Sequence, residues 1–170
     1  MAEVIDTIDQ AIKATTIKTG KYLTFSLDEE EYGIGILKVK EIIGMMPITS
    51  VPRTPDFVKG VINLRGKVIP VIDLRSKFKM QVIPYTERTC IIVVEIDSES
   101  GTILIGIVVD EVSEVLNIGE EQIEEAPGFG SKVNTGYILG MAKIEGRVKI
   151  LLNIDQVLSS EEISAVGKVS

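Results

Sequence analysis

The sequence predicts a mainly β protein built from two small β-barrels that arose by internal duplication, followed by a short C-terminal helix. Two observations lead to this prediction. Isoleucine and valine together make up roughly a quarter of the chain, and both residues favour strands over helices. A hairpin-like stretch at residues 60–75 is also repeated at residues 140–154, and a period of this length indicates a duplicated domain rather than a solenoid.

Residues 60–75 predict a hairpin, because runs of β-branched residues flank Arg65 and Gly66. The glycine supplies the positive φ that a tight reversal needs. Pro70 has no N–H to donate, so we expect its strand to lie at an edge or to carry a bulge. Asp73 is a suitable N-cap for the short helical turn that follows.

The second copy resembles this stretch, and one difference at the hairpin tip breaks the symmetry. Arg65 is replaced by Glu145. If Arg65 is only a solvated turn residue, the replacement has little meaning. If Arg65 contacts a partner, only one copy makes that contact. The matched pairs are Gly60 with Gly140, Gly66 with Gly146, Val68 with Val148, and Asp73 with Asn153.

The chain before each hairpin is also similar in the two copies, since residues 33–43 match residues 106–116. Lys21–Leu27 and Tyr32–Ile36 predict two strands. The four acidic residues between them lack the alternating oxygen ligands of a calcium loop, so we interpret them as a solvated turn. Residues 1–20 have apolar residues at helical spacing and are either a loose tail or a short helix.

Gln81–Thr89 links the two copies, and the motif Pro55-Asp-Phe57 resembles Pro127-Gly-Phe129. The second copy has additional residues at 130–136, where Gly, Ser and Asn predict a loop. A Ser and a Glu three positions apart, Ser159 and Glu162, form a capping-box pattern that opens a short helix.

About five short strands in each half suit a small closed barrel, which leaves no strand edge exposed. We expect the first barrel mainly at residues 21–80 and the second mainly at 88–158, and we leave open whether the barrels exchange a strand. Residues 1–20 precede this double-barrel domain, and a C-terminal helix or tail at 159–170 follows it.

The composition excludes several kinds of active site. The chain contains no histidine, which removes Ser-His and Cys-His nucleophile pairs and histidine metal ligands. The glycines at 33–35 and 128–132 lack the complete dinucleotide and phosphate-loop motifs. We therefore predict that the protein is not an enzyme, needs no cofactor and holds no metal.

The alternative reading is a small barrel that binds nucleic acid or another ligand. The formal net charge of −7 and the aromatic content of 5% argue against nucleic acid, which needs a basic face with stacking rings. Cys90, the single cysteine, begins an apolar run and predicts a buried, unreactive thiol. No apolar stretch is long enough to span a membrane, and residues 1–20 do not resemble a signal peptide. We expect a cytoplasmic protein.

Several motifs together resemble the CheW family of bacterial chemotaxis coupling proteins. The resemblance extends in order from about Lys21 to Leu158 and is strongest at residues 32–43, 60–66, 68–75 and 106–116. It implies two SH3-like five-stranded β-barrels. It also implies a non-enzymatic scaffold that couples the cytoplasmic tips of chemoreceptors (methyl-accepting chemotaxis proteins) to the histidine kinase CheA and to other CheW-like domains. Such arrays are associated with the membrane, but the scaffold itself does not insert into it.

The resemblance places receptor contacts in the groove between the barrels and on the adjoining face of the first barrel. For the apolar candidates, core packing is the alternative, because strand alternation buries every second residue. Glu41 and Arg65 are stronger candidates, since charged side chains are seldom fully buried. No kinase-binding residue follows from the resemblance. The receptor-contact candidates are Val39, Glu41, Ile42, Lys59, Gly60, Arg65, Val112 and Val115.

Overall fold

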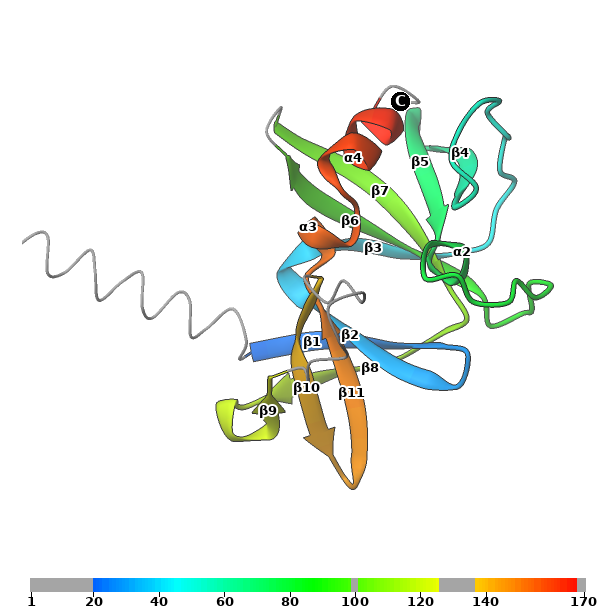
Figure 1. Cartoon of the computed structure of the whole chain (residues 1–170). Helices are drawn as coiled ribbons and strands as arrows, with labels where there is room; N and C mark the ends of the chain where they lie inside the picture. The colour runs from blue at the N-terminus through cyan, green and yellow to red at the C-terminus, as the bar shows by residue number, and fades with distance from the viewer. Residues whose placement is uncertain (1–19, 99–100, 126–136, 168–170) are drawn as a thin grey trace, which may run out of the picture.

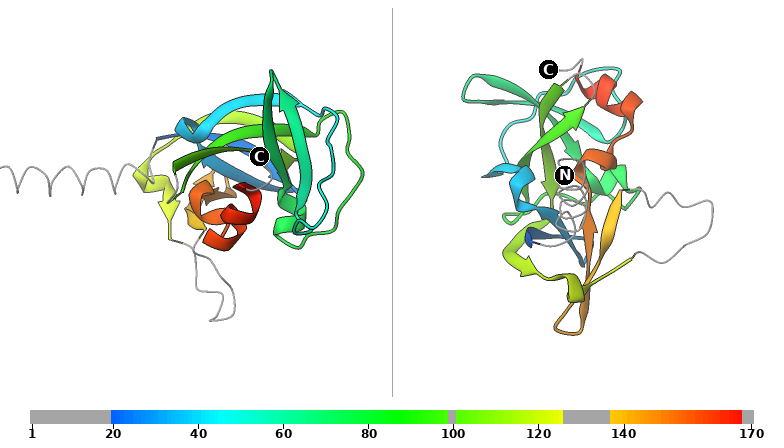
Figure 2. Two further views of the ribbon diagram at one scale, coloured as in Figure 1. Left: turned by 90° about the horizontal axis from the view of Figure 1, so that it is seen from above. Right: turned by 90° about the vertical axis from the view of Figure 1, so that its left-hand side faces the viewer.

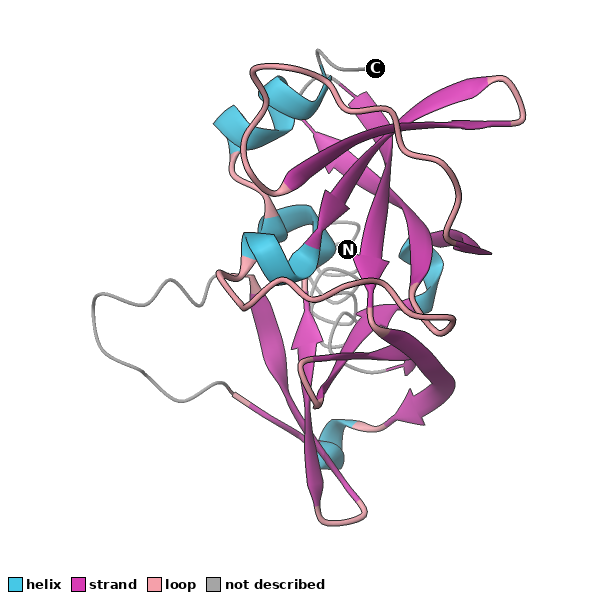
Figure 3. Cartoon of the chain, turned by 90° about the vertical axis from the view of Figure 1, so that its right-hand side faces the viewer, coloured by secondary structure: helices cyan, strands magenta, loops and turns pink. Residues whose placement is uncertain are grey.

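A computed structural model describes residues 20–98, 101–125 and 137–167 (Figure 1). The tail or helix expected before residue 20, the motif at 127–129 and the loop expected at 130–136 lie outside the described residues. Strands dominate the rest, and the helices are short (Figure 3). In chain order the elements are β1 (Gly20–Leu27), β2 (Glu30–Gly35), η1 (Ile36–Lys38), β3 (Val39–Gly44), β4 (Val58–Leu64), β5 (Lys67–Asp73), α2 (Leu74–Lys77), β6 (Cys90–Ser98), β7 (Gly101–Val109), β8 (Glu111–Ile118), η2 (Glu120–Gln122), β9 (Ile123–Glu124), β10 (Ile138–Ile144), β11 (Arg147–Leu152), α3 (Ile154–Val157) and α4 (Ser160–Gly167).

The strands form two sheets whose orders correspond to each other. One sheet has the order β3-β6-β7-β5-β4 and forms barrel 1, and the other has the order β8-β1-β2-β11-β10-β9 and forms barrel 2. In each sheet, the first hairpin of one copy lies between strands of the other copy. β2 therefore pairs in parallel with β11, and β5 pairs in parallel with β7.

This exchange corrects the expected division of the chain. The barrels do not separate at residues 21–80 and 88–158, because β1 and β2 belong to barrel 2 whereas β6 and β7 belong to barrel 1. Each copy gives up a whole hairpin rather than a single strand. The physical consequence is that all four exchanged strands gain a partner on both sides, which leaves none of them as an edge.

Each barrel closes through the segment of chain that follows its first strand in the sheet order, β3 in barrel 1 and β8 in barrel 2. Thr49 exchanges two backbone hydrogen bonds of 2.9 Å with Val61 of β4. In barrel 2, β9 follows β8 and pairs with β10 in the same way. A Cβ atom on Gly60 would lie 2.0 Å from the carbonyl oxygen of Thr49, and one on Gly140 would lie 2.8 Å from a side-chain carbon of Ile123. The two matched glycines thus mark the same closing contact.

The sequence predicts an edge strand or a bulge at Pro70. β5 is not an edge, because it runs between β4 and β7, and the register shift of the hairpin lies on the opposite strand, between Val58 and Gly60. The partner of Pro70 across the hairpin, Val61, directs both backbone polar groups to Thr49. Pro70 therefore needs no hydrogen bond to β4, and the parallel ladder with β7 begins one residue later, at Val71. The N–H that proline lacks is therefore not needed for pairing with β4 or with β7.

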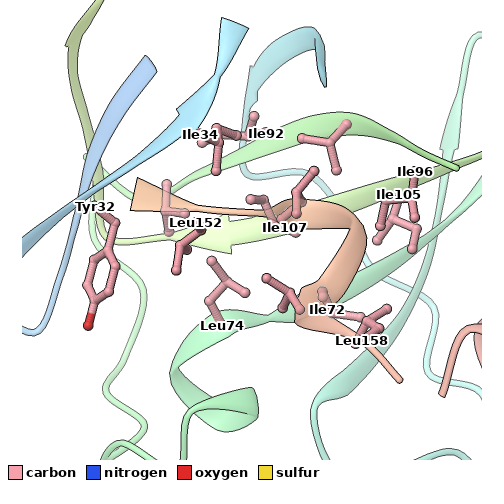
Figure 4. Close-up of a cluster of buried hydrophobic side chains, with 14 of the residues drawn as sticks. Tyr32, Ile34, Ile72, Leu74, Ile92, Ile96, Ile105, Ile107, Leu152 and Leu158 are labelled. Carbon is pink, nitrogen blue, oxygen red and sulfur yellow. The ribbon is translucent and has the colours of Figure 1, made fainter. Parts of the chain in front are cut away.

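The buried apolar residues of the described chain form three clusters, and the largest joins the two barrels. Barrel 1 has an interior around Ile62, Ile69 and Val93, and barrel 2 has a smaller one around Tyr22 and Leu151. The largest cluster lies between the barrels and takes residues from both sheets (Figure 4). It includes Leu23, Phe25, Ile34, Ile72, Ile92, Ile107, Leu152 and Val166. The barrels therefore share one core.

The predicted helix caps are confirmed. Asp73 accepts a hydrogen bond of 2.9 Å from the backbone N–H two residues later, and Asn153 does the same at 3.1 Å. Ser159 and Glu162 form the capping box, with hydrogen bonds of 2.8 and 3.1 Å between side chain and backbone in both directions. The helix that follows, α4, packs its buried Val166 against the shared core and lies beside barrel 1 (Figure 2).

Candidate functional site

Glu41 and Arg65, two of the three charged candidates, lie against each other. Glu41 lies on β3, and Arg65 lies at the tip of the β4–β5 hairpin. The Arg65 guanidinium donates two hydrogen bonds to the Glu41 carboxylate, one from Nη1 at 2.9 Å and a second from Nη2. Hydrogen bonding from Arg65 holds the pKa of Glu41 below its ordinary value. A planar fork paired with a carboxylate at two points fixes the orientation of both groups.

This ion pair spans the mouth of barrel 1. An open groove of about 810 Å³ lies there, and the rim carries a second ion pair, Lys40–Glu95, at 2.6 Å. The buried residues Ile69 and Val93 belong to the barrel interior and also line the groove. Apolar and charged side chains therefore both line the groove at the mouth of barrel 1, and two ion pairs lie there.

The ion pair is specific to barrel 1. Arg65 and Gly66 have φ angles of 52° and 87°, and Glu145 and Gly146 have φ angles of 51° and 78°, so both tips are turns with two positive φ values. The residue that matches Glu41 in the second copy is Glu114. Because Glu114 and Glu145 are both acidic, this pair of positions has no cation to form the same bridge.

The four apolar candidates form two matched pairs on the side of each sheet that carries the shared core. Val39 and Val112 pack against that core and are partly buried. Ile42 is 44% exposed and Val115 is 49% exposed. Ile42 lies opposite Ile92 of β6, and Val115 lies opposite Leu23 of β1; both partners belong to the shared core. Directly opposite residues on neighbouring strands point to the same face, so Ile42 and Val115 extend the shared core to the surface.

In the described part of the chain, no hydrogen bond or ion pair joins Lys59 or Gly60 to the Glu41–Arg65 pair. Both lie at the register shift of β4, between Val58 and Gly60. Gly60 is buried beneath Thr49, with φ of 144°. Its small size therefore serves the closure of barrel 1.

Sequence reasoning missed Leu37 on η1, whose side chain is 91% exposed. It lies two residues before Val39. Since Val39 matches Val112, the residue that matches Leu37 is Asp110. A leucine whose counterpart is charged is not required for a core shared by both copies, and the repeat contained this signal. Sequence reasoning also missed the exposed apolar residues Val82, Ile83 and Tyr85 in the link between the copies.

Cys90 is half-buried rather than fully buried. Burial raises the pKa of its thiol above the ordinary value, which favours the unreactive protonated form. Within the described ranges, no cluster of three or more Cys, Asp or Glu side chains is arranged to hold a metal ion. Among the helices described, none has the length and apolar character needed to cross a bilayer.

Comparisons with known proteins agree with this architecture. The family model described as CheW-like domain matches residues 21–162. Chemotaxis protein CheW of Klebsiella aerogenes is 47% identical over 150 residues, which cover 88% of both chains. Chemotaxis protein CheW of Bacillus subtilis is 36% identical over 146 residues, which cover 85% of this chain and 91% of the relative.

Among solved structures, the scaffolding protein TtCheW from Thermoanaerobacter tengcongensis is similar with a TM-score of 0.74 and 36% sequence identity. The match covers 85% of this chain and 97% of that one. Family model, curated relatives and solved structure therefore agree with each other over most of the chain. The chain belongs to the CheW family of chemotaxis scaffolding proteins.

Proposed function

We propose that this protein couples chemoreceptors to a CheA-type histidine kinase as a non-catalytic scaffold of the cytoplasm, recruited to receptor arrays at the membrane. The observation that carries the proposal is the extension of the shared core to the surface at Ile42 and Val115. This apolar surface is accompanied by the Glu41–Arg65 ion pair on the same barrel as Ile42. Apolar residues with flanking charges suit a helical partner that lays one face into a groove.

The receptor face of this proposal consists of side chains on β3, β8 and the β4–β5 hairpin. Ile42 and Val115 would contact the apolar stripe of a receptor helix, and Arg65 or Glu41 would pair with its charged flank. A modest interface would make each single contact weak. Repetition in an array raises the effective concentration and so strengthens binding. The receptor face comprises Val39, Glu41, Ile42, Lys59, Arg65, Val112 and Val115, with Gly60 as a packing residue beneath it.

We further propose that signal transfer by this protein involves no bond-making step. A scaffold acts through differences in its affinity for two states of its partners, and this requires no catalytic group. Family membership does not favour the alternative of a nucleic-acid-binding barrel. Purified protein should neither turn over nucleotides nor retain a stoichiometric metal in elemental analysis. One tightly held zinc ion per chain would contradict this proposal.

The receptor face is tested by calorimetric titration of a receptor cytoplasmic fragment into the wild type and two variants. Ile42→Asp places a charge on the proposed face and should weaken binding by about tenfold or more. Val148→Asp is the matched control, since Val148 is 47% exposed and lies on the β10–β11 hairpin, outside the proposed face. Equal losses in the two variants, or no loss in either, would contradict the proposed receptor face.

A further inference from the structure

Two clusters of charged residues lie at matching places in the two copies, where the chain passes from one barrel to the other. The Arg75 cluster consists of Arg75 on α2, Asp110 immediately before β8, and Asp28 in the β1–β2 turn. The Lys38 cluster consists of Lys38 immediately before β3, Asp97 on β6, and Asp155 on α3. Arg75 and Asp155 are matched positions, because each is the second residue after the matched caps Asp73 and Asn153.

The two clusters have opposite polarity. In the first, the cation Arg75 is on the helix after the hairpin and the anion Asp110 immediately precedes β8. In the second, α3 carries the anion Asp155 and the cation Lys38 immediately precedes β3. Both clusters also bind the end of the exchanged hairpin through backbone N–H groups. The N–H of Asp28 donates to Asp110 at 2.9 Å, and the N–H of Asp97 donates to Asp155 at 2.9 Å.

The Arg75 side chain is more buried than the Lys38 side chain. The Arg75 side chain is only 8% exposed. Its Nε and Nη2 atoms donate to the two oxygens of Asp110 at 2.7 and 2.5 Å, and Nη1 donates to the backbone carbonyl of Gln81 at 2.9 Å. Asp28 lies 3.6 Å away. A guanidinium held at three points within the fold has one geometry, and breaking such a buried pair leaves an uncompensated charge.

The Lys38 cluster is more exposed and is held by weaker interactions. The Lys38 side chain is 30% exposed, and its ammonium lies 3.0 Å from Asp97 and 2.8 Å from Asp155. An ammonium is a compact point charge without the fixed fork of arginine. Solvated pairs of this kind contribute little, because water screens them and the long side chain loses rotational freedom.

We propose that the Arg75 cluster is the fixed joint between the two barrels and that the Lys38 cluster is a weaker second joint, so that Arg75 is a positioning residue for the receptor face. The reason is the place of each cluster in the chain. Asp110 leads directly into β8, which carries Val112 and Val115, and Lys38 leads directly into β3, which carries Val39 and Ile42. The relative placement of these strands then depends on Arg75 in addition to the shared core. Only the link to receptor binding rests on the proposed function.

The relative placement of the barrels is tested by the distance between two spin labels, measured by pulsed electron paramagnetic resonance. The labels are attached at Lys67→Cys and Arg147→Cys in a Cys90→Ala background. Both label positions are exposed, and they lie at the tips of matched hairpins in the two barrels. Arg75→Met should broaden the distance distribution by about twofold or more. Lys38→Met is the matched control and should change the width much less. Asp110→Asn, which keeps the shape of the side chain, serves as the second variant if Arg75→Met does not fold.

A titration of the same variants with a receptor cytoplasmic fragment follows. Arg75→Met, which lies outside the receptor face, should weaken binding by about fivefold, a typical coupling between sites. Equal broadening by Arg75→Met and Lys38→Met, or unchanged distances in both Arg75→Met and Asp110→Asn, would overturn the proposed joint. If the wild type does not bind the fragment, the proposed function fails, while the distance measurement still decides whether Arg75 joins the barrels.

Discussion

Arg65 and Glu145 occupy the same position of the same turn in the two copies, with φ of 52° and 51°, and carry opposite charges. The turn therefore accepts either an arginine or a glutamate without a change of backbone. What differs is the neighbour. Arg65 pairs with Glu41 across the mouth of barrel 1, whereas Glu145 and the residue that matches Glu41, Glu114, are both acidic. The two copies therefore differ in the ion pair at this position rather than in the backbone of the hairpin.

The first prediction is that Arg65→Glu weakens binding of a receptor cytoplasmic fragment by at least about tenfold. The melting temperature should stay within a few degrees of the wild type, because Glu145 shows that this turn accommodates glutamate. Titration calorimetry gives the affinity, and a thermal scan gives the stability. The matched control is Glu145→Arg, for which we expect a much smaller change in affinity.

A double variant distinguishes the effect of the Glu41–Arg65 ion pair on receptor binding from the effect of each charge at its own position. The double variant Glu41→Arg with Arg65→Glu restores the pair with its polarity reversed. If only the local geometry of the pair matters, the double variant will bind like the wild type. We expect it to remain weak, because a receptor contact depends on the position of each charge. Restored affinity would show that Arg65 acts through Glu41 alone.

Much of the local structure was predictable from the sequence. The hairpin at 60–75, its repeat and the caps Asp73 and Asn153 depend on residues close together in the chain. The two sets of matched residues also indicated a duplication, which the corresponding strand orders confirm. Local patterns of this kind are set by turn geometry and capping, which short segments encode.

The exchange of hairpins between barrels was not predictable in the same way. β2 pairs with β11, and no local pattern specifies a partner more than a hundred residues away. The Glu41–Arg65 pair was likewise visible only as two separate candidates. The burial of Arg75 was not predicted either, because its partner Asp110 belongs to the other copy.

A second prediction concerns the closure of barrel 1. Gly60→Ala would bring a Cβ atom to 2.0 Å from the Thr49 carbonyl oxygen, at a φ of 144°. We expect a loss of about 3 kcal/mol or more in the free energy of unfolding, since both backbone strain and a steric clash are introduced. Gly66→Ala is the matched control, with φ of 87° but no atom within 4 Å of the new Cβ. It should cost about 1 kcal/mol. Urea unfolding measures both, and similar losses would contradict the closure contact.

The third prediction concerns an ion pair between the barrel 2 strands β2 and β11. The Lys149 side chain is 8% exposed and pairs with Glu31, whereas the pair Lys143–Glu124 of the same barrel is more than half exposed on both sides. Glu31→Gln leaves the Lys149 charge without its partner and should destabilise the fold by about 2 kcal/mol. Glu124→Gln should cost about 0.5 kcal/mol or less. Urea unfolding at neutral pH distinguishes these values, and equal costs would contradict the role of burial.

The last prediction is a dependence of stability on acid pH that arises at Asp110. Burial by itself would raise the pKa of this carboxyl, but hydrogen bonds from Arg75 and from the N–H of Asp28 outweigh burial and hold the pKa below its ordinary value. A carboxyl whose pKa is lower in the folded state stabilises the fold above its unfolded pKa, near 3.9, and the stabilisation disappears as the pH falls through the folded value. The effect therefore belongs to the range below about pH 4.

Asp110→Asn removes this titration. At pH 7 the variant should be less stable than the wild type by about 1.5–3 kcal/mol, the usual contribution of a hydrogen bond to a charged group. The difference should shrink as the pH falls below about 4, because the wild type then loses the same interaction by protonation. Urea unfolding over the acid range measures this convergence. Asp97→Asn is the control, since that side chain is 67% exposed, and its unfolding curve should follow the wild type. A difference between Asp110→Asn and the wild type that stays constant down to the lowest accessible pH would show that Asp110 does not titrate with folding.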